Sequence, residues 1–457
     1  MSGPRAQVYE RNMHVLTETI VTEISQAPTV LATHAGKRAP WRLFTERQRW
    51  SFLGVLFLVT TSNYFDYNVL SILLEPIKEE FRVSDTKLGL LSGAMFAMVY
   101  ALAGLPIARW ADRGNRRTVM VLAVSGWSAM TLLCGMAQSF WQLALARFGL
   151  GATESGGIPP AQSLVMDYFP PERQGFASSV LISGTSAGYL VGVVLGGSIA
   201  AAWGWRMAFT AGGIAGLALA IAVRWVIPEP RLQLGFPECP AQNDTIWRAF
   251  TELARKRTFL YTLIAISVYQ VFACGFQAFL PAFMMRTLHT SLAEVSLVWG
   301  LAISAASLIG ALFGGWLGDR LGQRDVRWYG WLPAAGCLAS VPFYVLAIVS
   351  TRFSSFIVAD FLAETVLAIG LGVCFIPILT VCGDHRRTMG MALTQLSFMV
   401  VGGGLGPVLA GSLSDFLGGS YGVQGLRYAL AGMIVFLIPA AAAFVRAGRM
   451  LPLERTE

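Results

Sequence analysis

The dominant pattern along the chain is a series of long apolar stretches separated by short polar ones. A hydrocarbon core of about 30 Å needs roughly 20 mostly apolar residues per helix, so each stretch predicts a membrane-spanning helix, and there are about twelve. They cover residues 51–74, 88–107, 119–137, 143–166, 175–202, 207–227, 259–285, 295–317, 328–349, 353–382, 389–413 and 426–445. The pattern therefore predicts an all-α membrane protein with twelve transmembrane helices.

The polar stretches divide the chain into five parts. Residues 1–49 contain no apolar run of spanning length and predict a tail, and residues 448–457 predict a second, short one. The longest internal polar stretch, 228–257, contains four prolines and is the expected linker. It separates two predicted bundles of six spans each, 50–227 and 258–447.

Basic residues indicate the orientation of these spans. Lys and Arg outnumber Asp and Glu by 34 to 26, but they occur in short groups between apolar stretches, which is a pattern of membrane topology and not of nucleic-acid binding. Besides the tail 1–49, the groups are Arg113-Arg116-Arg117, Arg255-Lys256-Arg257, Arg320-Arg324-Arg327 and Arg386-Arg387. Their common side predicts that both termini are cytoplasmic in a multi-pass protein of the cell (inner or plasma) membrane.

Composition agrees with a membrane class and offers no catalytic chemistry. The chain is 55% hydrophobic and 13% charged. Its six cysteines form no CxxC pair, its four histidines lie in the tail or in loops, and no P-loop is present. We therefore predict no enzyme, no metal site and no cofactor, and expect an ion gradient or the solute gradient to supply the energy.

Two segments of the first half recur in the second half, in the same order and on the same predicted side. The segment 104–117 after span two is echoed by 314–324 after span eight, and Gly204-Trp-Arg206 is echoed by Gly425-Leu-Arg427. Duplicated halves with a site at their interface are a transporter architecture. The repeat predicts two pseudo-symmetric six-helix bundles that rock about a central pathway.

The repeated loop has the chemistry of a conformational latch at a cytoplasmic gate. Gly104 would let helices approach closely, an aspartate can pair with arginine or cap a helix, and Gly114 turns the chain. The alternative is a short cationic loop that only obeys topology. The predicted gate residues are Gly104, Asp112, Arg113, Gly114, Arg116, Arg117, Asp319 and Arg320.

A stripe of glycines occurs in the span 175–202, at positions 184, 188, 192, 196 and 197. Small residues at this spacing let two helix backbones come close. The stripe predicts tight packing of span five against a neighbouring helix.

Five ionisable residues lie inside the predicted spans, where each is costly and therefore a functional candidate: Asp66, Arg147, Glu154, Asp360 and Glu364. Arg147 and Glu154 are seven residues apart on one helix face, and Asp66 lies at the depth of Arg147, so an Asp66–Arg147 pair is expected. Desolvation favours the protonated form of Glu154, whereas a nearby arginine favours the ionised form. A small movement can therefore change the protonation state of Glu154. The alternative is buried hydrogen bonding between helices. Asp360 and Glu364 lie toward the outer end of span ten, where water can reach them, and are secondary candidates.

Further polar residues in the spans are candidates for the wall of a solute cavity. They are Asn63, Tyr67, Tyr269, Gln270, Gln277 and Gln395. Each of them can equally hold two helices together by a hydrogen bond.

The repeated loop around Asp112-Arg113-Gly114 and Asp319-Arg320, in a chain of twelve spans, resembles the signature loop of the major facilitator superfamily. The resemblance extends over about residues 50–445, through Arg147-Phe-Gly-Leu-Gly151 and the paired Gly-Trp-Arg positions. It implies the major facilitator fold.

A closer resemblance is to the spinster-like branch, which shares its pattern with anion:cation symporters. It is carried by Asn63-Tyr-Phe-Asp66, the segment Arg147 to Ser163, Asp167-Tyr-Phe-Pro-Pro-Glu172-Arg173, Leu405-Gly-Pro407 and Ser414-Asp415. The resemblance implies that Asp66 and Glu154 take part in proton coupling and Arg147 in substrate binding or charge pairing. The family pattern has Arg after the span-one Asp, whereas this chain has Tyr67.

The sequence thus predicts a secondary active transporter of a small organic solute, coupled to protons. An organic anion or carboxylate is favoured because Arg147 is the one deeply placed cation, with the lipid bilayer, the solute and protons as partners and a monomer as the functional unit. The alternatives are a spinster-type exporter of lysolipids or sphingoid lipids and a non-transporting membrane sensor. No nucleic-acid partner is expected.

Overall fold

The protein is built from helices, as a computed structural model of the chain shows. The structure describes residues 40–230, 251–382 and 387–454. All regular elements in these ranges are helical. The predicted tails and most of the predicted linker lie outside them.

The first half of the chain forms six helical passes, several of them assembled from shorter helices. Proline, glycine and π-helical turns interrupt an otherwise continuous apolar pattern, which is why one predicted span corresponds to two or three elements. After η1 (Pro40–Leu43) the elements are α2 (Glu46–Phe81); α3 (Asp85–Gly89), η2 (Leu90–Ala94) and α4 (Met95–Arg113); α5 (Arg116–Met136); α6 (Phe140–Glu154) and α7 (Ile158–Tyr168); α8 (Pro171–Leu190), η3 (Val191–Gly196) and α9 (Gly197–Trp203); and α10 (Trp205–Val226).

The second half follows the same order of passes. Its elements are α13 (Arg257–Thr287); α14 (Leu292–Glu294), η4 (Val295–Trp299) and α15 (Gly300–Gly322); α16 (Trp328–Val349); α17 (Phe353–Leu371) and α18 (Ile376–Cys382); α19 (Arg387–Ser397), η5 (Phe398–Leu405) and α20 (Gly406–Tyr421); then η6 (Gly422–Gln424), α21 (Gly425–Ile434) and α22 (Leu437–Glu454). The π-helical turns η2, η3, η4 and η5 fall in the second and fifth passes of each half. The sequence repeat is therefore matched by a repeat in helix geometry.

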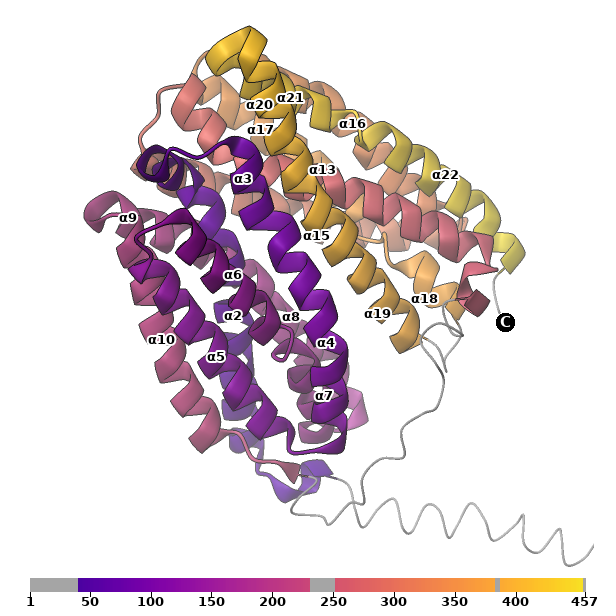
Figure 1. Cartoon of the computed structure of the whole chain (residues 1–457). Coiled ribbons are helices and arrows are strands. Elements are labelled where there is room, and N and C mark those ends of the chain that lie inside the picture. The colour runs from indigo at the N-terminus through magenta and orange to yellow at the C-terminus, as the bar shows by residue number, and fades with distance from the viewer. Residues whose placement is uncertain (1–39, 231–250, 383–386, 455–457) are drawn as a thin grey trace, which may run out of the picture.

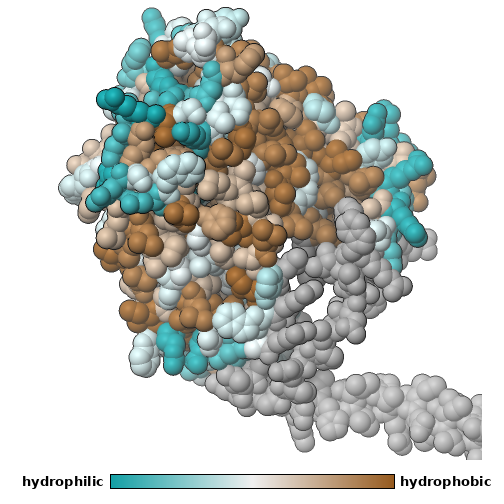
Figure 2. Space-filling view, in the orientation of Figure 1, coloured by the Kyte–Doolittle hydropathy of each residue, from teal (hydrophilic) through white to brown (hydrophobic). Residues whose placement is uncertain are grey.

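The outer surface is apolar, as a membrane protein requires. Figure 1 shows the two halves as separate groups of helices, and Figure 2 shows hydrophobic side chains over the middle of the visible face with hydrophilic ones gathered toward its ends. Within the described ranges, nine helical stretches are long and apolar enough to cross a membrane. One of them, Leu393–Glu454, covers most of two predicted spans, and α2 and the α6–α7 pass are not among the nine.

The predicted close packing of the glycine stripe is confirmed. A Cβ atom at Gly184 would lie 2.8 Å from the carbonyl oxygen of Phe57, and one at Gly188 would lie 2.5 Å from that of Thr61. Because a Cβ atom at either position would clash with backbone, these glycines let α8 lie directly against α2.

The two halves are joined by charged contacts on the side of the molecule opposite Glu46 and Glu454, which we call the distal side. Arg286 at the end of α13 donates to both oxygens of Asp85, at 2.7 and 2.9 Å, and from Nε to Glu75 at 2.6 Å. Lys78 also contacts Asp85 at 2.7 Å. In the described part of the chain, the ion pairs that link the halves are those made by Arg286, and we call this cluster the distal latch.

The ends of α3 and α20 strengthen the same junction. Asp415 accepts the backbone N–H groups of Asp85 and Thr86 at 2.9 and 2.7 Å, which satisfies donors that a helix start leaves unpaired. A Cβ atom at Gly411 would lie 2.2 Å from the carbonyl oxygen of Asp85, so the crossing of α3 and α20 requires glycine there. Figure 1 shows α3 and α20 together at the top, while α7 and α18 lie apart on the opposite side.

A second charged contact on the distal side joins Glu80 and Arg206, both of the first half. Glu80 lies beyond the end of the predicted span 51–74. Arg206 donates to both of its oxygens at 2.7 Å. These hydrogen bonds from Arg206 hold the pKa of Glu80 below its usual range. The side chains of Arg206 and Glu80 are 36% and 41% exposed, so solvent screens this pair far more than the distal latch.

Candidate functional site

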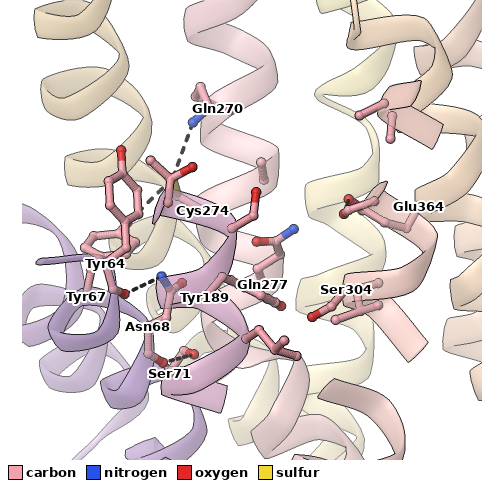
Figure 3. A pocket seen from close by; sticks show the side chains of 18 of the residues that line it. Tyr64, Tyr67, Asn68, Ser71, Tyr189, Gln270, Cys274, Gln277, Ser304 and Glu364 are labelled. Carbon is pink, nitrogen blue, oxygen red and sulfur yellow. Dashed lines mark hydrogen bonds between the residues drawn. The ribbon is translucent and has the colours of Figure 1, made fainter. Parts of the chain in front are cut away.

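A cavity of about 830 Å³ lies between the two halves. Most of its wall is formed by α2 and α8 of the first half and by α13, α15 and α17 of the second, with single contributions from η2, α6 and α20 and two residues of η5; Figure 3 shows part of the lining. Its polar and charged lining residues are Asn63, Tyr64, Tyr67, Asn68, Ser71, Ser92, Glu154, Thr185, Ser186, Tyr189, Tyr269, Gln270, Gln277, Ser304, Ser307 and Glu364. The volume and the mixed lining are typical of a site for a small organic molecule.

The polar stripe on α2 faces this cavity. Tyr64, Tyr67, Asn68 and Ser71 recur every three or four residues, so they share one face of the helix, and Figure 3 shows them together. The hydroxyl of Tyr67 contacts the sulfur of Cys274 on α13 at 3.8 Å. Tyr67, which stands where the family pattern has Arg, therefore lies at the junction of the halves.

Glu154 lies on the cavity wall at a break in the helix. It is the last residue of α6, and residues 155–157 form a turn before α7 begins at Ile158. Glu154 is 2% exposed, and its Oε1 has no hydrogen-bond partner among the described residues. Discontinuous helices are typical of the binding sites of transporters, and an unpartnered carboxyl oxygen at such a break is a strong functional signal.

Arg147 and Asp66 adjoin, but the expected ion pair between their side chains is not formed. Nη1 of Arg147 donates to the backbone carbonyl oxygen of Asp66 at 2.9 Å, while the Asp66 carboxylate accepts from Thr131 at 2.8 Å. Arg147 is completely buried and packs over the ring of Phe96, and neither Arg147 nor Asp66 lines the cavity. The prediction that Asp66 and Arg147 lie at the same depth agrees with their contact, but the direction of the Asp66 carboxylate was not predicted.

Asp360 is more buried than predicted, whereas Glu364 is half-buried and faces the cavity. They were expected near water at the outer end of span ten, but Asp360 is 1% exposed and Glu364 lines the cavity. Asp360 accepts from Nε1 of Trp299 at 2.8 Å, and Glu364 accepts from Ser307 at 2.7 Å and from Tyr344 at 3.0 Å. Neighbouring helices cover Asp360, so a buried carboxyl group is present in the second half as well as in the first.

Most of the other predicted cavity residues are on its wall. Asn63, Tyr67, Tyr269, Gln270 and Gln277 line the cavity. Gln395 does not line it and is exposed. Its helix α19 lies beside α18, on the side of the molecule opposite α3 (Figure 1), where a polar side chain meets solvent.

The predicted gate residues have mixed surroundings. Arg116 is fully buried and donates to Ser163 and Asp167 of the first half and to Glu229 at the start of the predicted linker, at 2.6 to 2.8 Å. A Cβ atom at Gly104 would meet only Ser155, at an ordinary 3.7 Å, so the expected close approach there is absent in this conformation.

Among the remaining gate residues, those whose side chains the structure describes provide no contact between the halves here. Gly114, Asp319 and Arg320 are exposed, and Arg117 is half-buried. The side chains of Asp112 and Arg113 lie outside the described ones. The gate therefore stays a prediction, for a conformation in which this side is closed.

Several functional candidates were missed from the sequence. Ser307, Tyr344 and Trp299 contact the acids of α17 from other helices, and sequence spacing carries no signal for such contacts. Tyr64, Asn68 and Ser71 could have been found from the sequence, because their helical spacing places them on the same face as Tyr67.

The charge of the cavity wall is acidic. Glu154 and Glu364 line it, and no Lys, Arg or His is among its lining residues in the described ranges. The same ranges contain no group of three or more His, Cys, Asp or Glu side chains that could hold a metal ion. Arg147, on which the predicted organic anion depends, is not among the residues on the wall.

Comparison with known proteins identifies the class. Residues 56–398 match the Major Facilitator Superfamily, so the chain belongs to this family of membrane transporters. It is 34% identical to an MFS-type efflux pump of Mycolicibacterium smegmatis over 406 aligned residues. These residues cover 87% of this chain and 90% of the pump.

The relatives also include the spinster-like branch. Protein spinster homolog 1 of Homo sapiens is 25% identical over 389 residues, which cover 80% of this chain and 73% of that protein. A crystal structure of a bacterial homolog to the human lysosomal transporter Spinster, in an inward-facing and unoccupied conformation, matches with a TM-score of 0.83 and 28% identity, over 91% of this chain and 100% of that chain. The predicted family and branch are thus confirmed, and the chain is a transporter and not an enzyme.

Proposed function

We propose that this transporter moves a small amphipathic organic solute by alternating access, coupled to protons, through the cavity between its halves. The proposal includes twelve spans, cytoplasmic termini, the cell (inner or plasma) membrane and a functional monomer. The cavity wall supports an amphipathic solute, because α2 and α13 supply polar groups while Leu301 and Leu308 of α15 supply apolar ones. The efflux pump among the relatives favours outward transport.

The observation that carries proton coupling is the position of Glu154. It lies on the wall of the cavity, is almost completely buried and has an oxygen without a hydrogen-bond donor among the described residues. A carboxyl group without donors is least costly when it is protonated. Glu154 is therefore a group that holds a proton in this conformation and releases it when donors or a cation approach.

Arg147 is the cation that suits this exchange. Its Nε and Nη2 have no hydrogen-bond partner among the described residues, and it lies two helical turns from Glu154 on the same face of α6. A rotation of α2 against α6 during the transport cycle would bring the carboxylate of Asp66 to these nitrogens, and new side-chain rotamers on α6 would bring Arg147 and Glu154 together. Each would then lose its proton to the side that is open.

The acidic wall changes the expected charge of the solute. Two acidic side chains line the cavity in the described ranges, Glu364 and the Glu154 that we propose to be protonated, and no basic side chain does. A carboxylate solute would lose its hydration without gaining a cationic partner. We therefore propose a neutral or cationic solute in place of the organic anion expected from the sequence.

The test is solute-driven proton movement in proteoliposomes that contain only this protein and a pH-sensitive dye. A panel of hydrophobic amines, alcohols, carboxylates and lysolipids is added, and lumenal pH is followed. We expect Glu154→Gln to abolish the solute-driven pH change while counterflow of the labelled solute persists, and the exposed-site control Glu79→Gln to behave as wild type. Solute-driven proton flux that survives in Glu154→Gln would overturn the coupling assignment.

A spinster-type lysolipid exporter is the second candidate, and one observation favours it. Leu301 and Leu308 line the cavity and are 52% and 61% exposed, so the cavity is open along this apolar face of α15. A single acyl chain fits against such a face. If lysolipids and none of the compact solutes produce flux, this second function is the correct one.

A further inference from the structure

We propose that Glu364 and Asp360 of α17 form a subsite for a protonated amine, so that the transported solute is a hydrophobic amine. This inference rests on the proposed function and specifies its substrate class. It assigns a binding role to two acids of the second half, whereas proton coupling is assigned to the first half.

Glu364 faces the cavity and is held in place by two hydroxyl groups. Ser307 donates to Oε1 at 2.7 Å and Tyr344 donates to Oε2 at 3.0 Å, so each carboxylate oxygen has a hydroxyl donor. Hydrogen bonds to the ionised form stabilise that form. Figure 3 shows Glu364 and Ser304 on the wall opposite Tyr64 and Asn68, with Gln277 between the two walls.

A second acidic oxygen lies behind Glu364 and lacks a partner. Asp360 is 1% exposed, its Oδ2 accepts from Trp299, and its Oδ1 has no hydrogen-bond partner among the described residues. Asp360, Glu364, Tyr269 and Gln277 line a small cavity of about 10 Å³, and the last three also line the large one. Such a space accommodates a water molecule or the head of a primary ammonium group, whose three N–H donors match acceptors placed around it.

The rest of the wall suits the remainder of such a solute. Tyr189 and Tyr269 line the cavity and offer aromatic faces, which attract cations. Leu301 and Leu308 offer apolar surface for a hydrocarbon or aromatic tail. An anionic solute finds no cationic partner among the described lining residues, whereas an amine finds Glu364.

The experiment measures binding of three matched probes to the purified full-length protein by titration calorimetry. The probes are 4-phenylbutylamine, 4-phenyl-1-butanol and 4-phenylbutyrate, which share one tail and differ in the charge of the head. We expect the amine to bind best and Glu364→Gln to weaken it about tenfold or more, the effect of a lost hydrogen bond to a charged group. Asp360→Asn, which keeps an acceptor for Trp299, should weaken it less, and Glu79→Gln should not weaken it.

Binding of the alcohol serves as the check that Glu364→Gln remains folded, since that affinity should change little. The inference is overturned if wild type does not bind the amine, if it prefers the butyrate, or if Glu364→Gln and Glu79→Gln bind the amine equally. Failure of the proposed function is a separate result, because it requires that Glu154→Gln keeps solute-driven proton flux, whatever the charge of the solute.

Discussion

The fourth pass of each half places ionisable residues at matching positions with different chemistry. Arg147 and Asp360 each come seven residues after the first residue of their helix, α6 and α17, and each is buried. Both passes then break, at 155–157 and at 372–375. Ahead of these breaks lie Glu154 in the first half and Glu364 in the second, and both reach the same cavity.

The difference between the two carboxylates is in their donors. Glu154 has an oxygen without a partner among the described residues, and Glu364 has a hydroxyl on each oxygen. A carboxyl group without donors is suited to carry a proton, and one with two donors is suited to stay charged. Duplicated halves can thus divide proton coupling and solute recognition between equivalent helices.

The largest expected effect is on stability, when Arg147 or Asp360 is replaced by a neutral residue. Arg147→Gln removes the hydrogen bond to the carbonyl oxygen of Asp66 and leaves two buried acids without a cation, which we expect to cost about 3 kcal/mol of stability. Asp360→Asn should cost less, because an amide oxygen still accepts from Trp299. The melting temperature of the purified protein in detergent measures both variants.

The control for loss of a positive charge is Arg224→Gln, at an exposed position of α10. Its melting temperature should stay close to that of wild type. If Asp360→Asn is as unstable as Arg147→Gln, the two positions serve the same structural purpose and the comparison between the halves fails.

The distal latch allows the comparison to be tested in another conformation. Arg286→Gln removes charged hydrogen bonds to Asp85 and Glu75 that exist only when the distal side is closed. A loss of roughly 2 kcal/mol would shift the population toward distal-open states about thirtyfold. Distances between spin labels on α3 and α20 would report this opening.

Arg206→Gln is the matched control, because it removes a charged pair within one half and at an exposed site. It should leave the label distances unchanged. If Arg286→Gln gives the wild-type distances, the distal latch does not hold the halves together, and packing of Gly411 against Asp85 is left as the main restraint.

The fold could be predicted well because it depends on hydrophobic length. The apolar runs predicted the membrane passes, the repeated loops predicted the two halves, and the glycine stripe predicted the close packing of α8 on α2. Breaks within passes were not predicted, since the turn at 155–157 and the π-helical turns arise from packing and leave the hydropathy pattern intact. The contacts of Arg286 were missed because they join ends of helices more than 200 residues apart.

The site could be predicted only to the level of which residues are buried and charged. Burial of Asp66, Arg147 and Glu154 followed from their place in apolar runs. The direction of the Asp66 carboxylate toward Thr131, and the hydroxyl of Tyr344 on Glu364, depend on rotation of helices and on neighbours from other passes. Since these contacts decide which acid carries charge, we propose a neutral or cationic solute where Arg147 alone predicted an anion.

The smallest expected effect is that of Tyr344→Phe on amine affinity. It tests most directly whether Glu364 binds the solute while Glu154 carries the proton. Tyr344→Phe removes one of the two hydroxyl donors of Glu364, so the amine affinity should fall about fivefold, equivalent to about 1 kcal/mol for one hydrogen bond. Proton flux that depends on Glu154 should persist, and Tyr421→Phe, at a 55% exposed position, should change neither property. A rise in amine affinity would mean that Tyr344 competes with the solute for Glu364. The hydroxyls of Ser307 and Tyr344 would then occupy the place of the ligand and would not stabilise the charge of Glu364.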